Sequence, residues 1–205
     1  ILFLKQLKIK IIKIPSGEIT NIPYLKVLGK TSLKIILSTG MSTIEEIKNA
    51  LSILIKAGAK RSNITIMHCI SEYPTRYQDV NLRNIITIKE NFGGNVGFSD
   101  HTQDNLSSIL AVGMGVSVIE KHITFSNKAK GPDHVASLNP KNFFKFVQDV
   151  RNAGIILGSK KRKPTSIEKK NSKVVRKSIY AIKRIKKGEK FTIKNISTKR
   201  PGKYL

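Results

Sequence analysis

The chain reads Asn95-Val96-Gly97-Phe98-Ser99-Asp100-His101-Thr102 across a short apolar run that ends in a polar cluster. A second run of this kind, at residues 116–124, carries His122 near its end. Short β-branched runs followed by polar residues are typical of buried strands. In a parallel sheet wound by helices, the chemistry lies at the carboxyl ends of the strands. The two runs therefore predict strands whose ends bring His101 and His122 to one site.

Similar runs recur along the chain, at residues 9–14, 34–37, 64–67, 95–98 and 117–119. Helical patterns accompany them, at residues 21–28, 42–57, 82–92, 105–114 and 140–157. The clearest helix begins at Ser42, which is expected to form a capping box with Glu45. Strand starts that recur every ~20–30 residues have the spacing of βα units. The fold is therefore expected to be α/β, with five βα units in an open doubly wound sheet or in part of an eight-stranded barrel. Because no Gly-x-Gly-x-x-Gly opens a helix, a dinucleotide-binding fold is disfavoured.

The composition changes after residue 157. Residues 158–171 are rich in Gly, Pro and charge, which is typical of a linker. A short strand is expected at residues 178–182, but the segment 172–205 holds too little apolar material for a core of its own. The expected organisation is a domain at residues 1–157, a linker at 158–171 and the start of a small β-rich domain at 172–205.

The formal net charge of +25 raises the question of a nucleic-acid partner. The chain holds 30 Lys, 8 Arg and 30 Ile, a joint enrichment that codon bias in an AT-rich genome would produce. Basic and aromatic residues do not alternate in the way that stacks bases. We therefore expect no nucleic-acid partner and interpret the charge as a solvated surface. The alternative is a non-catalytic polyanion-binding module, since residues 158–205 hold 18 basic and 2 acidic residues.

Three features bear on the compartment. No apolar run approaches the ~20 residues of a membrane span, so no membrane partner is expected. A signal peptide is not expected, because the first residues lack Met and a small-residue cleavage site, and an opening in mid-pattern suggests a fragment. The single cysteine, Cys69, is compatible with a reducing cytoplasm and is expected to pack in the core.

Polar clusters follow all five strand-like runs, which indicates a shared site. Ser16, Ser38 and Ser99 are small hydroxyl donors next to Gly or in tight turns, where backbone N–H groups can also face an anion. Lys13 and Lys121 can add positive charge for a phosphate or a carboxylate. The residue types therefore predict a phosphorylated or carboxylated substrate.

Two histidines without a set of cysteines do not suit structural zinc, which takes four ligands. They suit a metal that keeps open positions for substrate and water. The alternative for His101 and His122 is a hydrogen-bonded core residue at a strand end. For His68 and His134 that alternative is the preferred interpretation.

Six motifs in a fixed order then resemble one family, the bacterial sialic acid synthases (N-acetylneuraminate synthase and close relatives). They are Lys13-Ile14-Pro15-Ser16-Gly17-Glu18, Leu37-Ser38-Thr39-Gly40-Met41, His68-Cys69-Ile70-Ser71-Glu72-Tyr73-Pro74, Gly97-Phe98-Ser99-Asp100-His101-Thr102, Glu120-Lys121-His122-Ile123-Thr124 and Gly131-Pro132-Asp133-His134. The resemblance implies the C-terminal five βα units of a TIM (β/α)8 barrel, followed by the start of an antifreeze-like (SAF) domain, truncated at both ends. Since five strands do not close such a barrel, the chain alone is expected to fold poorly and to be inactive.

The resemblance also implies a reaction. Phosphoenolpyruvate condenses with the open-chain aldehyde of N-acetylmannosamine, and N-acetylneuraminate and phosphate are released. A divalent metal assists, with Mn²⁺ expected and Mg²⁺ or Co²⁺ as alternatives, and the family forms a domain-swapped homodimer. Two further enzyme readings stay open, a synthase for a related nonulosonic acid of the legionaminate type and an enzyme of spore-coat polysaccharide synthesis.

Site residues follow from the resemblance position by position. The metal ligands are expected to be His101 and His122. Phosphoenolpyruvate contacts are expected from Lys13, Ser16, Ser38, Ser71 and Ser99, although some family members have Asn where this chain has Ser71. Sugar-side residues are expected to be Glu18, Tyr73 and Asp133, and Glu18 is the expected proton-handling catalytic group. Arg176 resembles the arginine that the antifreeze-like domain inserts into the partner's active site.

Overall fold

The structure is a computed structural model that describes residues 2–200. The chain divides into two compact units, residues 1–158 and residues 159–205, which are described separately. Residues 201–205 of the expected second domain lie outside the described residues.

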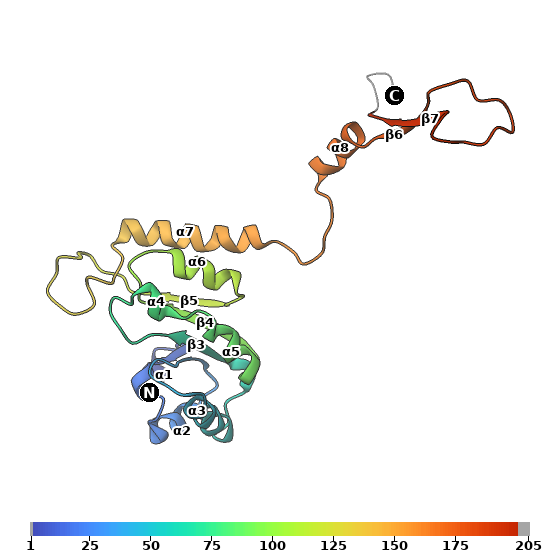
Figure 1. Cartoon of the computed structure of the whole chain (residues 1–205). Coiled ribbons are helices and arrows are strands. Elements are labelled where there is room, and N and C mark those ends of the chain that lie inside the picture. The colour runs from blue at the N-terminus through green and yellow to red at the C-terminus, as the bar shows by residue number, and fades with distance from the viewer. Residues whose placement is uncertain (1, 201–205) are drawn as a thin grey trace. The chain divides into compact units, whose positions relative to one another are not determined.

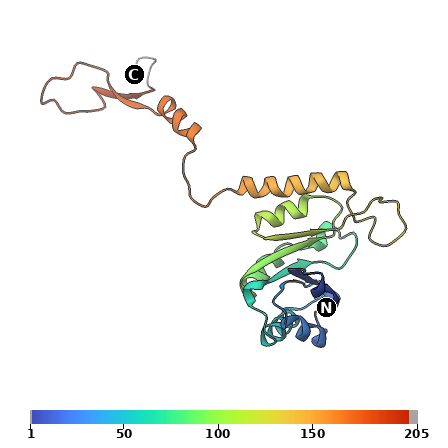
Figure 2. The ribbon, with the colours of Figure 1, turned by 180° about the vertical axis from the view of Figure 1, so that it is seen from behind.

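The first unit is built on one five-stranded sheet, curled like part of a barrel (Figures 1 and 2). Its strands are β1 (Ile11–Ile14), β2 (Lys34–Ser38), β3 (Ile64–Cys69), β4 (Asn95–Asp100) and β5 (Val118–Lys121). All neighbouring pairs are parallel, and the strands lie in sequence order β1-β2-β3-β4-β5. A doubly wound sheet reverses its strand order at a switch point, whereas a barrel adds each strand beside the last. The prediction of five βα units of a TIM barrel is therefore confirmed.

Helices lie before the first strand, between the strands and after the last one. They are α1 (Leu2–Gln6), α2 (Ile22–Gly29), α3 (Ile44–Lys56), α4 (Tyr77–Val80), α5 (Asn84–Phe92), α6 (Leu106–Gly113) and α7 (Pro140–Leu157). Two short 3₁₀ turns are η1 (Ser16–Glu18) and η2 (Arg61–Asn63). Helix α2 packs against α3, and α6 packs against α7. None of the helices among residues 2–200 has the length and the apolar character needed to cross a membrane.

The core lies between the sheet and the helices that cover it. Every strand from β1 to β4 contributes a fully or nearly fully buried side chain, namely Ile14, Leu37, Ile66 and Phe98. Helix α3 buries Ile47, Ala50, Leu51 and Leu54 against them. Burial of side chains of this size is the main favourable term in folding. It holds the strands in register and so fixes where their carboxyl ends lie.

The expected capping box of α3 is wrong by one residue. Ser42 lies in the preceding turn, where its N–H donates to the Thr39 carbonyl at 3.2 Å. Thr43 is the N-cap, because its hydroxyl accepts from the Glu46 N–H while the Glu46 carboxylate accepts from the Thr43 N–H. The sequence offers two overlapping Ser/Thr-x-x-Glu pairs, and the extent of the turn decides between them.

His68 is a hydrogen-bonded core residue, as expected. Its Nε2 lies 2.7 Å from the Val80 carbonyl oxygen, and its ring stacks on Phe98 with centroids 5.8 Å apart. Burial lowers the pKa of His68 below its usual value, while the Val80 contact opposes the shift. The folded protein therefore resists protonation of this ring.

We expect the free energy of unfolding to fall as the pH drops below about 6.5, because the unfolded chain then binds protons that the folded chain does not. Burial lowers the pKa of His101 in the same way, so both rings contribute. Urea unfolding at pH ~7.5 and pH ~5.5 measures the effect. His68→Gln should show a smaller loss of stability between the two pH values than the wild type. An equal loss in both proteins would contradict this origin of the pH dependence.

The second unit contains helix α8 (Ser166–Val175) and an antiparallel pair of strands, β6 (Ser178–Ala181) and β7 (Ile196–Lys199). Helix α8 begins within the range expected to be a linker, because Thr165 and Glu168 form a capping box at its start. Within residues 159–200, only Asn195 is buried. The start of an antifreeze-like domain stays a prediction.

Candidate metal centre and anion pocket

A cavity of about 430 Å³ opens at the carboxyl ends of the strands. Its lining is Lys13, Pro15, Ser16, Gly17, Ser38, Met41, Cys69, Ser71, Tyr73, Ser99, His101, Glu120 and His122. Each of the five strands contributes at least one of these residues, through Lys13, Ser38, Cys69, Ser99 and Glu120. The polar clusters that follow the strand-like runs therefore meet in one place, as parallel strands require.

His101, Glu120 and His122 form a candidate metal centre. One ligand atom from each of the three lies within 4.8 Å of the others. Glu120 and His122 are two residues apart along β5 and its extension, so their side chains share one face. Ser99 of β4 is in register with Glu120, which brings His101 to the same level. Two imidazoles and one carboxylate suit a divalent ion that keeps open positions.

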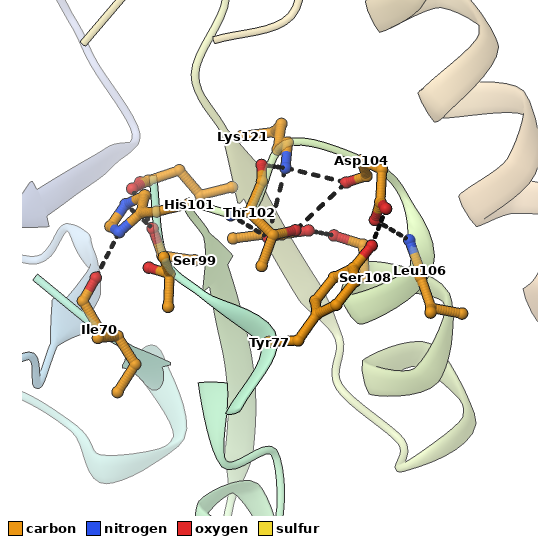
Figure 3. Close-up of polar contacts among 12 residues, drawn as sticks. Ile70, Tyr77, Ser99, His101, Thr102, Asp104, Leu106, Ser108 and Lys121 are labelled. Carbon is orange, nitrogen blue, oxygen red and sulfur yellow. Dashed lines mark hydrogen bonds and ion pairs between the residues drawn. The ribbon is translucent and has the colours of Figure 1, made fainter. Parts of the chain in front are cut away.

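The orientation of His101 fits a ligand role. Its Nδ1 lies 2.6 Å from the Ile70 carbonyl oxygen, to which an Nδ1–H can donate (Figure 3). Its Nε2 then faces the cavity, 3.1 Å from the Ser99 hydroxyl. A backbone carbonyl on one ring nitrogen fixes the tautomer that presents the other. Burial lowers the pKa of His101, which favours the neutral ring that a metal binds.

Tyr73 and Asp133 lie against the two histidines. The Tyr73 ring centroid is 4.1 Å from that of His101 and 5.3 Å from that of His122. The Asp133 carboxylate is 3.7 Å from Nδ1 of His122. Burial is the main cause that raises the pKa of Tyr73, so its hydroxyl stays protonated at neutral pH. Of the three residues expected on the sugar side, Tyr73 and Asp133 therefore lie beside the candidate metal ligands.

Lys13 and Ser99 both contact Glu120. The Lys13 ammonium is 3.0 Å from Oε1 of Glu120, and the Ser99 hydroxyl donates to the same oxygen at 2.8 Å. These contacts join the expected anion-binding residues to the candidate metal centre.

The other side of the cavity is crowded with small donors and acceptors. The Gly40 N–H donates to the Ser16 hydroxyl at 3.0 Å and to the Cys69 sulfur at 3.1 Å. The Ser38 hydroxyl is buried and has no hydrogen-bond partner. An unpartnered buried hydroxyl in a cavity lining is suited to a polar ligand atom.

Three of the expected site residues, Glu18, Asp133 and Arg176, are not part of this lining. Glu18 lies in η1, and its carboxylate accepts from the Asn21 amide at 2.5 Å. Arg176 is the C-cap of α8 in the second unit. The roles assigned to Glu18 and Arg176 stay predictions.

The expectation that Lys121 supplies charge to an anion is wrong. Its side chain is fully buried and pairs with Asp100 at 3.3 Å. Strand alternation sends Glu120 to the cavity and the next residue to the opposite face. The same rule identifies Glu120, which the sequence analysis left without a role although it stands two residues before His122.

Comparison with known protein families identifies the family of this chain. The model of the NeuB family matches residues 1–162. The chain belongs to the NeuB family. This match confirms the resemblance to the sialic acid synthases that the motifs suggested.

Relatives that are similar to this chain differ in their named products. N,N'-diacetyllegionaminic acid synthase of Campylobacter jejuni is 48% identical over 97% of this chain and 59% of its own length. Human N-acetylneuraminate-9-phosphate synthase is 31% identical over 96% of this chain and 54% of its own length. The chain therefore spans less than two thirds of the length of each of these relatives.

Solved structures agree with the fold. The N-acetylneuraminic acid synthetase of Leptospira borgpetersenii is 35% identical, covers 83% of this chain and 59% of its own, and superposes with a TM-score of 0.75. A spore coat polysaccharide biosynthesis protein E from Chromobacterium violaceum is 27% identical and covers 97% of this chain and 59% of its own, with a TM-score of 0.78.

Proposed function

We propose that this chain carries the metal and phosphoenolpyruvate sites of a nonulosonic acid synthase. The proposed reaction joins phosphoenolpyruvate to the open-chain aldehyde of an N-acetylated amino sugar and releases phosphate. One observation carries the proposal: a candidate metal centre and a pocket of small hydroxyl donors share one cavity in a NeuB family chain.

The chain's residues have separate roles in this proposal. The phosphate and the carboxylate of phosphoenolpyruvate are held by a set of small hydroxyl donors and one cation, namely Ser16, Ser38, Ser71, Ser99 and Lys13. His101, Glu120 and His122 hold the divalent metal, with Mn²⁺ proposed. When bound there, the metal acts as a Lewis acid on the aldehyde carbonyl. Tyr73 and Asp133 contact the sugar, and Glu18 transfers a proton. Arg176 acts in the partner of a domain-swapped homodimer.

The proposed steps conserve atoms and charge. The methylene carbon of phosphoenolpyruvate attacks the aldehyde carbon, a C–C bond forms, and the aldehyde oxygen takes up a proton. Water adds to the resulting cationic carbon and loses a proton. The C–O bond to phosphate then breaks as the new hydroxyl gives its remaining proton to the leaving phosphate, which leaves a 2-keto acid and inorganic phosphate. Holding the two reactants in reacting geometry can contribute roughly 7–11 kcal/mol at best.

The sugar acceptor is proposed to be of the legionaminate type. Relatives named N,N'-diacetyllegionaminic acid synthase are 48% and 41% identical, whereas the human N-acetylneuraminate-9-phosphate synthase is 31% identical. This favours an acceptor with two acetamido groups over N-acetylmannosamine, the acceptor that the motifs first implied.

Phosphate release tests the proposal. The protein, as its gene encodes it, is given phosphoenolpyruvate and Mn²⁺ with either N-acetylmannosamine or a diacetamido sugar. We expect phosphate release that requires both the metal and a sugar, and that is faster with the diacetamido sugar. Salt-dependent binding to nucleic acid without any phosphoenolpyruvate binding would favour the polyanion-binding alternative and overturn the proposal.

A further inference from the structure

Behind the candidate metal centre lies a fully buried ion pair. The Asp100 carboxylate and the Lys121 ammonium are 3.3 Å apart, and each side chain has 0% exposure. The two residues are direct partners in the register of β4 and β5. The pair therefore joins the two strands that carry the candidate ligands.

The position of the pair follows from strand alternation. Ser99 and His101 flank Asp100 in sequence, and Glu120 and His122 flank Lys121. Neighbouring side chains point to opposite faces of a strand. The ion pair therefore lies on the face of the sheet opposite to the cavity. It occupies the same position along β4 and β5 as the candidate ligands do on the cavity face.

Hydrogen bonds hold both members of the pair, and Figure 3 labels Lys121 together with the partner residues Thr102, Asp104 and Ser108. The Asp100 carboxylate accepts from the Thr102 N–H at 2.8 Å, from the Thr102 hydroxyl at 2.7 Å and from the Ser108 hydroxyl of α6 at 2.6 Å. The Lys121 ammonium donates to the carbonyl of Thr102 and, at 3.1 Å, to that of Asp104. The network fixes the turn that leaves β4, which begins with His101.

A buried ion pair is weak evidence for a stabilising role. Replacing such a pair by apolar residues is often neutral or stabilising, because desolvation offsets the attraction between the charges. Burial also lowers the pKa of Lys121, although Asp100 opposes the shift. What the pair does supply is a defined geometry, since three segments meet at two side chains: the end of β4, the end of β5 and the start of α6.

We propose that Asp100 and Lys121 are positioning residues for the metal centre. They fix the position of His101, at the end of β4, relative to Glu120 and His122, at the end of β5. The three ligand atoms can then converge on one ion. This inference rests on the metal centre of the proposed function, and neither residue touches metal or substrate.

Binding of Co²⁺, followed by its visible absorption, tests the proposal without any turnover. The variants are Lys121→Met, which removes the charge at similar length, and Asp100→Asn, which keeps the volume but replaces one acceptor oxygen with an NH2 donor. Leu54→Ala is the matched control, because Leu54 is fully buried in α3 and lies outside the cavity lining. Thermal unfolding of each variant is measured alongside.

We expect both network variants to bind Co²⁺ about 10–100-fold more weakly, with an altered absorption band. Leu54→Ala should lower the melting temperature but keep the wild-type affinity and band. Wild-type affinity and band in both network variants would overturn the positioning role, as would an equal loss of affinity in Leu54→Ala. Failure of the wild type to bind Co²⁺ would instead overturn the metal centre itself.

Discussion

Replacement of His101 with alanine is expected to abolish metal-dependent phosphate release. The substitution removes a ligand nitrogen whose orientation the Ile70 carbonyl fixes. Loss of a supporting group around a metal ligand costs roughly 10–100-fold, so loss of the ligand itself should cost at least ~100-fold in turnover. Phosphate release at saturating phosphoenolpyruvate and Mn²⁺ measures the effect.

His134→Ala serves as the control for this variant. His134 also makes one polar contact through Nδ1, to the Thr124 hydroxyl at 2.7 Å, but it is not part of the candidate metal centre. Turnover of the control should stay within a few-fold of the wild type. Unchanged turnover in His101→Ala would show that His101 is not a metal ligand.

Replacement of Gly40 with alanine is expected to block the anion pocket. A Cβ atom at this position would clash with the Ser71 hydroxyl, and it would lie 2.8 Å from the Ser16 hydroxyl and 3.1 Å from the Cys69 sulfur. These groups would have to shift, and two of them, Ser16 and Ser71, are proposed to hold the phosphate or the carboxylate. A displacement of this kind can cost ~100-fold in kcat/KM. We expect most of the loss in the KM for phosphoenolpyruvate.

Gly154→Ala is the matched control, because a Cβ at Gly154 meets nothing within 4 Å and the residue lies in α7. Its kinetics should equal those of the wild type. If Gly40→Ala kept the wild-type KM for phosphoenolpyruvate, the anion would have to bind elsewhere in the cavity.

Much of the fold could be predicted because its signals are local. Helix α7 has the bounds that the sequence indicated, since Asn139 caps it and Pro140 begins it. The sequence predicts the correct end for β1, but it predicts β2 to β5 too short at their carboxyl ends, where the strands end at Ser38, Cys69, Asp100 and Lys121. A prediction based on apolar runs does not detect these strand ends, because their residues are polar. These same strand ends contribute residues to the site.

The errors at the site have one cause. A cluster of neighbouring residues does not separate the two faces of a strand, so the sequence pattern predicts an anion contact for Lys121 and no role for Glu120. Counting by two from His122 would have chosen Glu120 and excluded Lys121. The pairing of Asp100 with Lys121 could not be predicted from the sequence, because it depends on the register between β4 and β5.

The contact between Lys13 and Glu120 has a thermodynamic consequence. A cation that takes Glu120 as its ligand competes with the Lys13 ammonium and frees it to bind an anion. Occupancy of one subsite should therefore raise the affinity of the other, and linkage requires the same factor in both directions. Phosphoenolpyruvate should tighten Mn²⁺ binding as much as Mn²⁺ tightens phosphoenolpyruvate binding, which makes the two ligands heterotropic partners before any sugar arrives.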